Sequence, residues 1–134
     1  MGTANPGSPT GLELEILKIL WDCSPMTVRE IRDTLDETAG RPLAHTTVIT
    51  MLSTMVDKQQ IEKLAPIQGK AFRFAPLVQR NDVSGNMVGD LVERVFDGSA
   101  EALMQRLFDV RDLDEKELTR LRKLVNQKLK ESRS

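Results

Sequence analysis

Apolar residues recur at helical spacing in the first part of the chain and predict two short amphipathic helices. The apolar positions are Leu12, Ile16, Ile19 and Leu20 in the first helix, and Val28, Ile31 and Leu35 in the second. Each stripe begins beside a Thr and a Glu at capping-box spacing, namely Thr10 with Glu13 and Thr27 with Glu30. We expect the second helix to end at about Gly40.

A third helix is predicted from Ala44 to Lys58, with two different faces. Its apolar stripe consists of Val48, Leu52, Met55 and Val56. Its other face carries the short polar side chains of Thr46, Thr50, Ser53 and Asp57. Because Ser and Thr favour a helix less than Ala, Lys or Glu do, a merely solvated face does not explain them. They suit a helix whose backbone lies close against another surface, such as the floor of a DNA groove.

A β-hairpin is predicted after the third helix. It consists of strands at 61–67 and 71–75, the turn Gln68-Gly69-Lys70 and a closing Pro76. Gly69 supplies the conformationally permissive turn residue. Phe72 and Phe74 alternate with Arg73, so we expect one face of the second strand to pack and the other to present a cation.

The rest of the chain predicts three more helices, each apolar on one side and charged on the other. The first spans 77–98 and is broken by Asp97-Gly98, Ser99 caps the second, and Asp112 with Glu115 starts the last. Three helices without a sheet to cover usually bury their apolar stripes against a second copy of the chain. The residues assigned to this dimerisation face are Val88, Leu91, Val92, Val95, Phe96, Leu103, Leu107, Phe108, Leu118, Leu121, Leu124 and Val125.

These elements predict an α+β chain that is mostly helical. We divide it into a flexible tail at 1–9, a winged helix-turn-helix at 10–76 and a helical dimerisation domain at 77–134. In a winged helix-turn-helix the third helix enters the major groove, and the hairpin lies along the backbone or minor groove. The same order of elements occurs in proteins that do not touch DNA.

Charge is unevenly distributed along the chain, although the net charge is only −1. Residues 41–80 contain six basic and two acidic side chains, whereas residues 1–40 contain three basic and seven acidic ones. A positive block beside a negative one would orient the protein on a polyanion. The alternative is ordinary fluctuation of charge along the chain.

The composition argues against an enzyme, a cofactor and a metal site. Cys23 is the only cysteine, and its place in an apolar run beside Trp21 predicts a core or near-core position. His45 is the only histidine, so no Ser-His-Asp or Cys-His arrangement and no clustered metal ligands are expected. No apolar run approaches the roughly 20 residues of a membrane span. Residues 1–11 lack the regions of a signal peptide, so a cytoplasmic location is expected.

Five segments resemble the penicillinase-repressor (BlaI/MecI/CopY-like) family of winged-helix transcriptional repressors. Residues 42–52 look like its recognition helix, and residues 68–76 look like its Gly-(Arg/Lys)-Ala-aromatic-Arg-aromatic-x-Pro wing. The other segments are 14–21, 27–31 and 95–103. The resemblance covers about residues 12–130, with matching order and spacing.

The resemblance implies a homodimer that blocks transcription by binding a palindromic operator in double-stranded DNA. The residues it implies in the major groove are Thr46, Ile49, Thr50 and Ser53, with Ile49 against a thymine methyl. Those expected on phosphates are Lys58, Lys63, Lys70 and Arg73. Thr47 caps the helix or touches a phosphate. His45 either contacts the DNA or lies on a solvated face.

Three departures from the family pattern bear on function. Thr54 stands where the family usually has Arg, and Gln59 stands where it usually has a left-handed Gly, so both bear on affinity and on helix-end geometry. The antibiotic-responsive members are cleaved by a regulatory protease at an Asn-Phe pair, whereas residues 105–108 read Gln-Arg-Leu-Phe. The paired C-terminal cysteines of the copper-responsive members are also missing. Neither mode of control carries over to this chain.

A dimeric DNA-binding repressor is therefore the leading hypothesis. The alternative is a winged-helix protein–protein interaction module without specific DNA binding, which the near-neutral charge and Thr54 favour. A third hypothesis, a regulator with a ligand pocket in the helical arm, needs an aromatic or polar lining that the arm's sequence does not supply.

Overall fold

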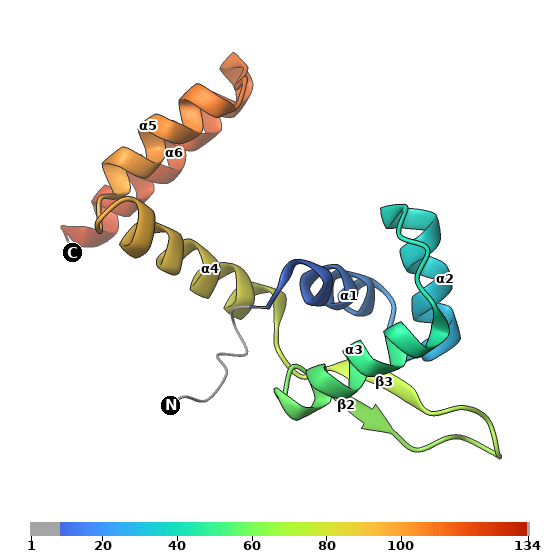
Figure 1. Ribbon diagram of the computed structural model, residues 1–134. Coiled ribbons are helices and arrows are strands. Elements are labelled where there is room, and N and C mark those ends of the chain that lie inside the picture. The colour runs from blue at the N-terminus through green and yellow to red at the C-terminus, as the bar shows by residue number, and fades with distance from the viewer. Residues whose placement is uncertain (1–8, 134) are drawn as a thin grey trace. The chain divides into compact units, whose positions relative to one another are not determined.

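The computed structural model describes residues 9–133 (Figure 1). Along the sequence, these residues divide into two units, the first ending at Asp90 and the second beginning at Leu91. The elements are α1 (Gly11–Asp22), β1 (Met26–Thr27), α2 (Val28–Ala39), α3 (His45–Asp57), β2 (Ile61–Leu64), β3 (Arg73–Pro76), α4 (Arg80–Val95), α5 (Ala100–Val110) and α6 (Glu115–Ser132). The expected fold class, a winged helix followed by further helices, is confirmed. The tail expected at 1–9 lies, except for Pro9, outside the described residues.

Both predicted capping boxes are present. The backbone N–H of Glu13 donates to Thr10 Oγ1 at 3.3 Å, and the Thr10 N–H donates to Glu13 Oε1 at 3.0 Å. The pair Thr27 and Glu30 repeats this reciprocal bonding at 3.1 and 2.8 Å. Each cap satisfies helix N–H groups that would otherwise lack a partner, a contribution of about 1 kcal/mol. The starts of α1 and α2 are therefore fixed by local sequence. Gly40, with a φ of 61°, ends α2 as predicted.

The sheet contains one strand that the sequence pattern did not predict. Strand β1 pairs antiparallel with β3, whose other edge pairs with β2, so the order is β1-β3-β2. The hairpin strands are shorter at the turn than expected, because residues 65–72 leave the ladder and both Gln68 and Gly69 have positive φ. Pro76 does not stand outside the hairpin but pairs with Ile61.

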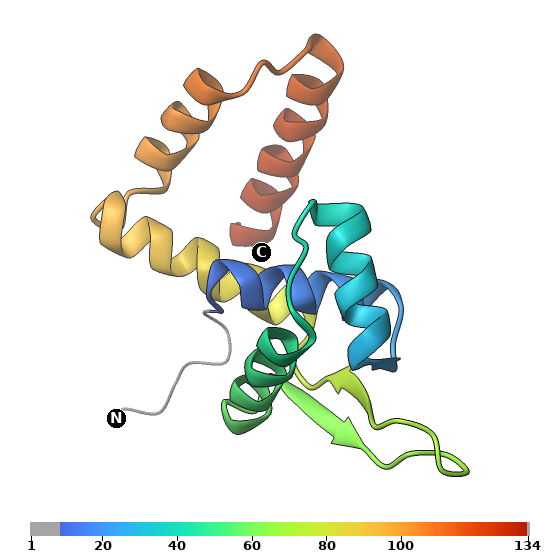
Figure 2. The same cartoon turned by 45° about the vertical axis from the view of Figure 1, so that its right-hand side comes forward.

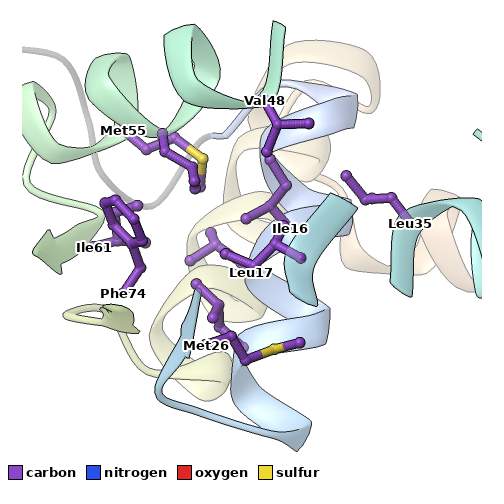
Figure 3. Close-up of a cluster of buried hydrophobic side chains, with 11 residues drawn as sticks. Ile16, Leu17, Met26, Leu35, Val48, Met55, Ile61 and Phe74 are labelled. Atoms are coloured by element: carbon purple, nitrogen blue, oxygen red, sulfur yellow. The ribbon is translucent and has the colours of Figure 1, made fainter. Parts of the chain in front are cut away.

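The core of the first unit joins α1, α2, α3 and the sheet (Figure 3). Its buried side chains are Ile16, Leu17, Leu20, Met26, Ile31, Leu35, Val48, Leu52, Met55, Ile61 and Phe74. Burying one such side chain contributes about 1.5–3 kcal/mol, so the predicted stripes of the three helices hold the unit together. Because α3 buries one stripe in this core, its opposite face is turned to solvent.

A buried carboxylate links the start of α1 to the end of α3. Glu13 is only 2% exposed, and its Oε2 accepts from the ammonium of Lys58 at 2.8 Å. Its Oε1 accepts from the backbone N–H of Thr10 and, at 3.3 Å, from Nε2 of the buried Gln60. Burial alone would raise the pKa of Glu13. The hydrogen bonds from Lys58, Thr10 and Gln60, with the Lys58 charge, outweigh it and lower this pKa below the ordinary 4.5.

Helix α3 ends in a Schellman motif with glutamine in the left-handed position. Lys58 is the C-cap residue, and Gln59 follows it with a φ of 62°. The N–H of Gln60 donates to the Met55 carbonyl at 2.9 Å, and that of Gln59 donates to the Val56 carbonyl at 3.0 Å. Gln59 therefore takes the left-handed position at which the resemblance led us to expect Gly, and both hydrogen bonds of the motif form with it.

Helix α4 begins at Arg80 rather than at 77, because the residues before it bond elsewhere. The N–H of Leu77 donates to the Gln60 carbonyl at 2.9 Å. The indole Nε1 of Trp21 donates to the Val78 carbonyl at 2.9 Å. The guanidinium carbon of Arg80 lies 5.2 Å from the centroid of the Trp21 ring. These contacts hold the first turn of α4 on α1 within the first unit.

Cys23 is exposed, so its predicted core position is wrong. It is the C-cap residue of α1, and its N–H donates to the Ile19 carbonyl at 2.9 Å. Its backbone is extended rather than helical, so its side chain no longer follows the buried stripe of α1.

The second unit contains the end of α4 with α5 and α6 (Figure 2). The break predicted at Asp97-Gly98 is confirmed, because both residues have positive φ and α4 ends at Val95. Ser99 caps α5 as predicted. The cap of α6 is Asp114 rather than Asp112, and it accepts from the Glu117 N–H at 2.9 Å.

Helices α5 and α6 have no buried core of their own. Within the described stretch 100–132, no side chain is buried. Phe108, Leu124 and Val125 are each roughly half exposed or more. Apolar surface of this kind is rarely left in water. Among the described helices, none is long and apolar enough to cross a membrane.

Candidate nucleic-acid interface

The exposed face of α3 carries the short polar side chains that the sequence singled out. Thr46, Thr50, Ser53 and Asp57 are all exposed, opposite the buried stripe of the helix. The hydroxyl of Thr50 donates to the Thr46 carbonyl at 3.0 Å, and that of Thr54 donates to the Thr50 carbonyl at 3.1 Å. Because these protons are given to the backbone, the hydroxyl oxygens present acceptors to a ligand.

The first turns of α3 add further groups to this face. His45 and Thr47 are exposed, and the aliphatic side chain of Ile49 is 41% exposed. The N-cap residue Ala44 provides no side-chain cap, and Thr47 makes no such cap either. The free backbone N–H groups of this turn can therefore donate to an anion such as a phosphate.

The hairpin supplies exposed cations beside α3. Lys70 is exposed in the turn, and the ammonium of Lys63 lies 4.2 Å from the centroid of the Phe72 ring. Phe72 was expected to pack with Phe74, but it is 46% exposed while Phe74 is buried. The reason is that Phe72 precedes β3, outside the ladder that carries Phe74 into the core.

Two other predicted phosphate contacts are less exposed than Lys63 and Lys70. The Lys58 ammonium is bonded to Glu13, as described above. Arg73 is half-buried on β3, and its Nε is a buried atom without a hydrogen-bond partner in the described chain. The structure therefore leaves Lys63 and Lys70 exposed, pairs Lys58 with Glu13 and half-buries Arg73.

A groove runs between α3, the hairpin and the start of α2. We call it the α3–wing groove. Its volume is about 560 Å³, and its lining includes Arg29, His45, Ile49, Ser53, Lys63 and Phe72. Four residues predicted from sequence to contact DNA, namely His45, Ile49, Ser53 and Lys63, thus share one concave surface.

Arg29 and Phe72 were not among the predicted contacts. Arg29 is exposed in the first turn of α2, directly before the capping Glu30. The capping box of Thr27 and Glu30 fixes the start of α2, so the sequence already placed Arg29 in the first turn of this helix. Phe72 was missed because its alternation with Arg73 and Phe74 predicted that it packs in the core.

The residues assigned to a dimerisation face are all at least partly exposed in the single chain. Seven of them are exposed: Val88, Leu91, Val95, Phe108, Leu118, Leu124 and Val125. Val92, Phe96, Leu103, Leu107 and Leu121 are half-buried. Within the described residues, none of the twelve is fully buried, so their apolar surface is available to another chain.

Residues 9–133 bring together no group of three His, Cys, Asp or Glu side chains that could hold a metal ion.

The family model described as penicillinase repressor matches residues 9–127, which is most of the chain. No curated protein matches the sequence.

Proposed function

Because the chain belongs to the penicillinase repressor family, we propose that it is a homodimeric transcriptional repressor that binds a palindromic operator. In this proposal α3 enters the major groove, and the hairpin follows the DNA backbone or minor groove. The observation that carries the proposal is the face of short polar side chains on α3, open to solvent beside the cations of the hairpin.

Base reading is assigned to the exposed side of α3. The oxygens of Thr46, Thr50 and Ser53 reach base edges or nearby phosphates, and Ile49 meets a thymine methyl. Small side chains allow the helix backbone to come close to the groove floor. His45 and Thr47, at the open N-terminus of α3, are assigned to the phosphate backbone.

Phosphate contacts position the protein without reading sequence. Lys63 and Lys70 are the strongest candidates because their ammonium groups are exposed. Arg73 and Lys58 follow. For Lys58, a phosphate would have to share the ammonium with Glu13.

Dimerisation is assigned to the second unit. An isolated chain leaves the apolar sides of α5 and α6 uncovered, and a second copy related by two-fold symmetry would cover both sets at once. The same symmetry explains why the operator is proposed to be a palindrome. Because the protein acts on DNA, its proposed place of action is the cytoplasm.

A second candidate, a protein–protein interaction module, is favoured by two observations. Thr54 replaces an Arg of the family, and its hydroxyl is turned back onto the Thr50 carbonyl, so the position offers no charge to DNA. With a net charge of −1, the chain also lacks a general attraction to polyanions.

Capture of fragmented genomic DNA separates these two functions. The purified protein is mixed with fragments at about 0.15 M salt, where non-specific binding is weak. Recovery of a recurrent palindrome, lost in the Thr50→Ala/Ser53→Ala double variant, supports the repressor. If a well-folded dimer enriches no sequence, the interaction module takes its place.

Salt dependence gives an independent measure on any captured site. A dimer that neutralises about four to six phosphates should show a log–log slope of roughly −4 to −5. A protein-binding module should bind no duplex at any salt concentration.

A further inference from the structure

The α3–wing groove has the size and lining of a small-molecule site. Its volume of about 560 Å³ falls within the range of roughly 300–1,000 Å³ typical of ligand pockets. Val28, Val56 and the buried Phe74 contribute apolar surface to its interior. Ile49 and Phe72 add partly exposed apolar side chains. A molecule in this groove would therefore contact hydrocarbon on several sides.

The charged groups of the groove favour an anion. Its lining contains the cations Arg29 and Lys63 and the imidazole of His45, against one carboxylate, Asp57. Within residues 9–133, neither Arg29 nor Lys63 forms an ion pair. Arg29 also lies in the first turn of α2, where the helix dipole favours negative charge. Asp57 stands at the far end of α3 from His45, about 18 Å away along the helix.

We propose that the α3–wing groove binds a small amphipathic anion, with an apolar ring system and one carboxylate or sulfonate, and that this ligand competes with DNA. The ring system lies against Ile49 and Phe72, and the anionic group faces both cations, Arg29 and Lys63. The competition rests on the proposed function, because Ile49, Ser53 and Lys63 both line the groove and are assigned to DNA. A bound ligand covers them and lowers operator affinity.

The first test uses a probe of this chemistry, 8-anilinonaphthalene-1-sulfonate, whose fluorescence rises when its rings enter apolar surroundings. Titration of the full chain should show saturable binding of one probe per chain. The uncharged analogue N-phenyl-1-naphthylamine, which lacks the sulfonate, should bind about tenfold more weakly. Equal binding of the two probes would overturn the anionic class of ligand.

Variants locate the site. Phe72→Ser removes an apolar wall and Lys63→Gln removes a cation, and each should weaken probe binding about tenfold. Both side chains are exposed, so the thermal unfolding of these variants should match the wild type. The control is Val110→Ser, which changes a 62% exposed apolar residue of α5 outside the groove. Loss of binding in the control, with both groove variants unaffected, would overturn the assignment.

The competition is measured separately with a captured operator duplex. Added duplex should displace the sulfonate probe at the concentrations at which it binds the protein. Simultaneous binding of both would overturn the competition. If no duplex binds while the probe titration and its variants behave as described, the proposed function fails and the ligand class of the groove stands.

Discussion

The ammonium nitrogen of Lys58 lies 2.8 Å from Oε2 of Glu13, so a cation expected to contact DNA is bonded to a buried carboxylate at the start of another helix. The two residues are 45 positions apart in the sequence. Their contact fixes the end of α3 relative to α1. It therefore helps to fix how the exposed face of α3 is presented, whether or not Lys58 also meets a phosphate.

Replacing Lys58 by Met should destabilise the protein. The change leaves the Glu13 carboxylate buried without its counter-charge, and because Lys58 is partly exposed we expect a loss of about 2 kcal/mol in the free energy of unfolding. Urea unfolding at pH 7 measures it. Lys70→Met is the matched control, since Lys70 is exposed in the turn and should change stability by less than about 0.5 kcal/mol. Equal stability of the two variants would show that the ion pair contributes nothing.

Stability should depend on pH through Glu13. Its pKa is lower in the folded protein than the ordinary value of 4.5, so its contribution is complete above 4.5 and is lost as the pH falls through the folded pKa. Wild type should therefore be more stable than Glu13→Gln at pH 7, and the difference should shrink below pH 4.5. Urea titrations of both proteins across pH 7 to 3 give this profile. A difference that stays constant with pH would contradict it.

Gln59→Gly should stabilise the protein. Gln59 has a φ of 62°, and a residue with a Cβ atom pays about 1 kcal/mol there that glycine does not. The thermal midpoint should rise accordingly, while DNA binding stays unchanged because the backbone keeps its course. Gln59→Ala is the control, because alanine has the same Cβ, and it should leave the midpoint nearly unchanged. A lower midpoint for the glycine variant would argue that the Gln59 side chain is itself stabilising.

Ile49 should be sensitive to one methyl group on the DNA. In a captured operator, thymine is replaced by uracil at one position at a time, which removes only the C5 methyl. At the position facing Ile49, wild-type binding should weaken about fourfold, the worth of one buried methyl. The Ile49→Ala variant should be insensitive there, whereas Thr50→Ala should keep the wild-type sensitivity. If replacing thymine by uracil weakens binding equally in both variants, Ile49 does not contact that methyl group.

A charge on the apolar side of α6 should break the dimer. Val125 is 56% exposed in the single chain, and Val125→Lys would bury an unpaired ammonium if a partner covers it. Sedimentation equilibrium should show dimers for wild type and monomers of 15.1 kDa for the variant. Gln127→Lys adds the same charge about 200° around the helix and should remain dimeric. Dissociation of both variants, or of neither, would contradict the assigned face.

The features that could be predicted from the sequence are those formed by residues close together along the chain. The capping boxes at Thr10 and Thr27 join residues three positions apart and were found directly. The apolar stripes of α1 to α3 needed only helical periodicity. Strand β1 has two residues and exists through its pairing with Arg73 and Phe74, far along the chain, so no local pattern marks it.

The candidate site also contains some features set by local spacing and others set by contacts between distant parts of the chain. The polar face of α3 follows from the spacing of Thr46, Thr50 and Ser53, and the structure turns that face to solvent. The pairing of Lys58 with Glu13 depends on two helices meeting in space, which charge counts along the chain do not reveal. Phe72 differs from Phe74 because of where the β-ladder ends, a property of the partner strand rather than of the residue itself.

The ladder between β2 and β3 stops at Leu64 and Arg73, and residues 65–72 project beyond it without strand pairing. Changes in length or composition within this loop would leave the register of the sheet and the packing of α3 intact. The length of the loop can therefore vary without a change in α3. Under the proposed function, a longer or more basic loop would change the contact with flanking DNA while α3 keeps its own contacts with the bases.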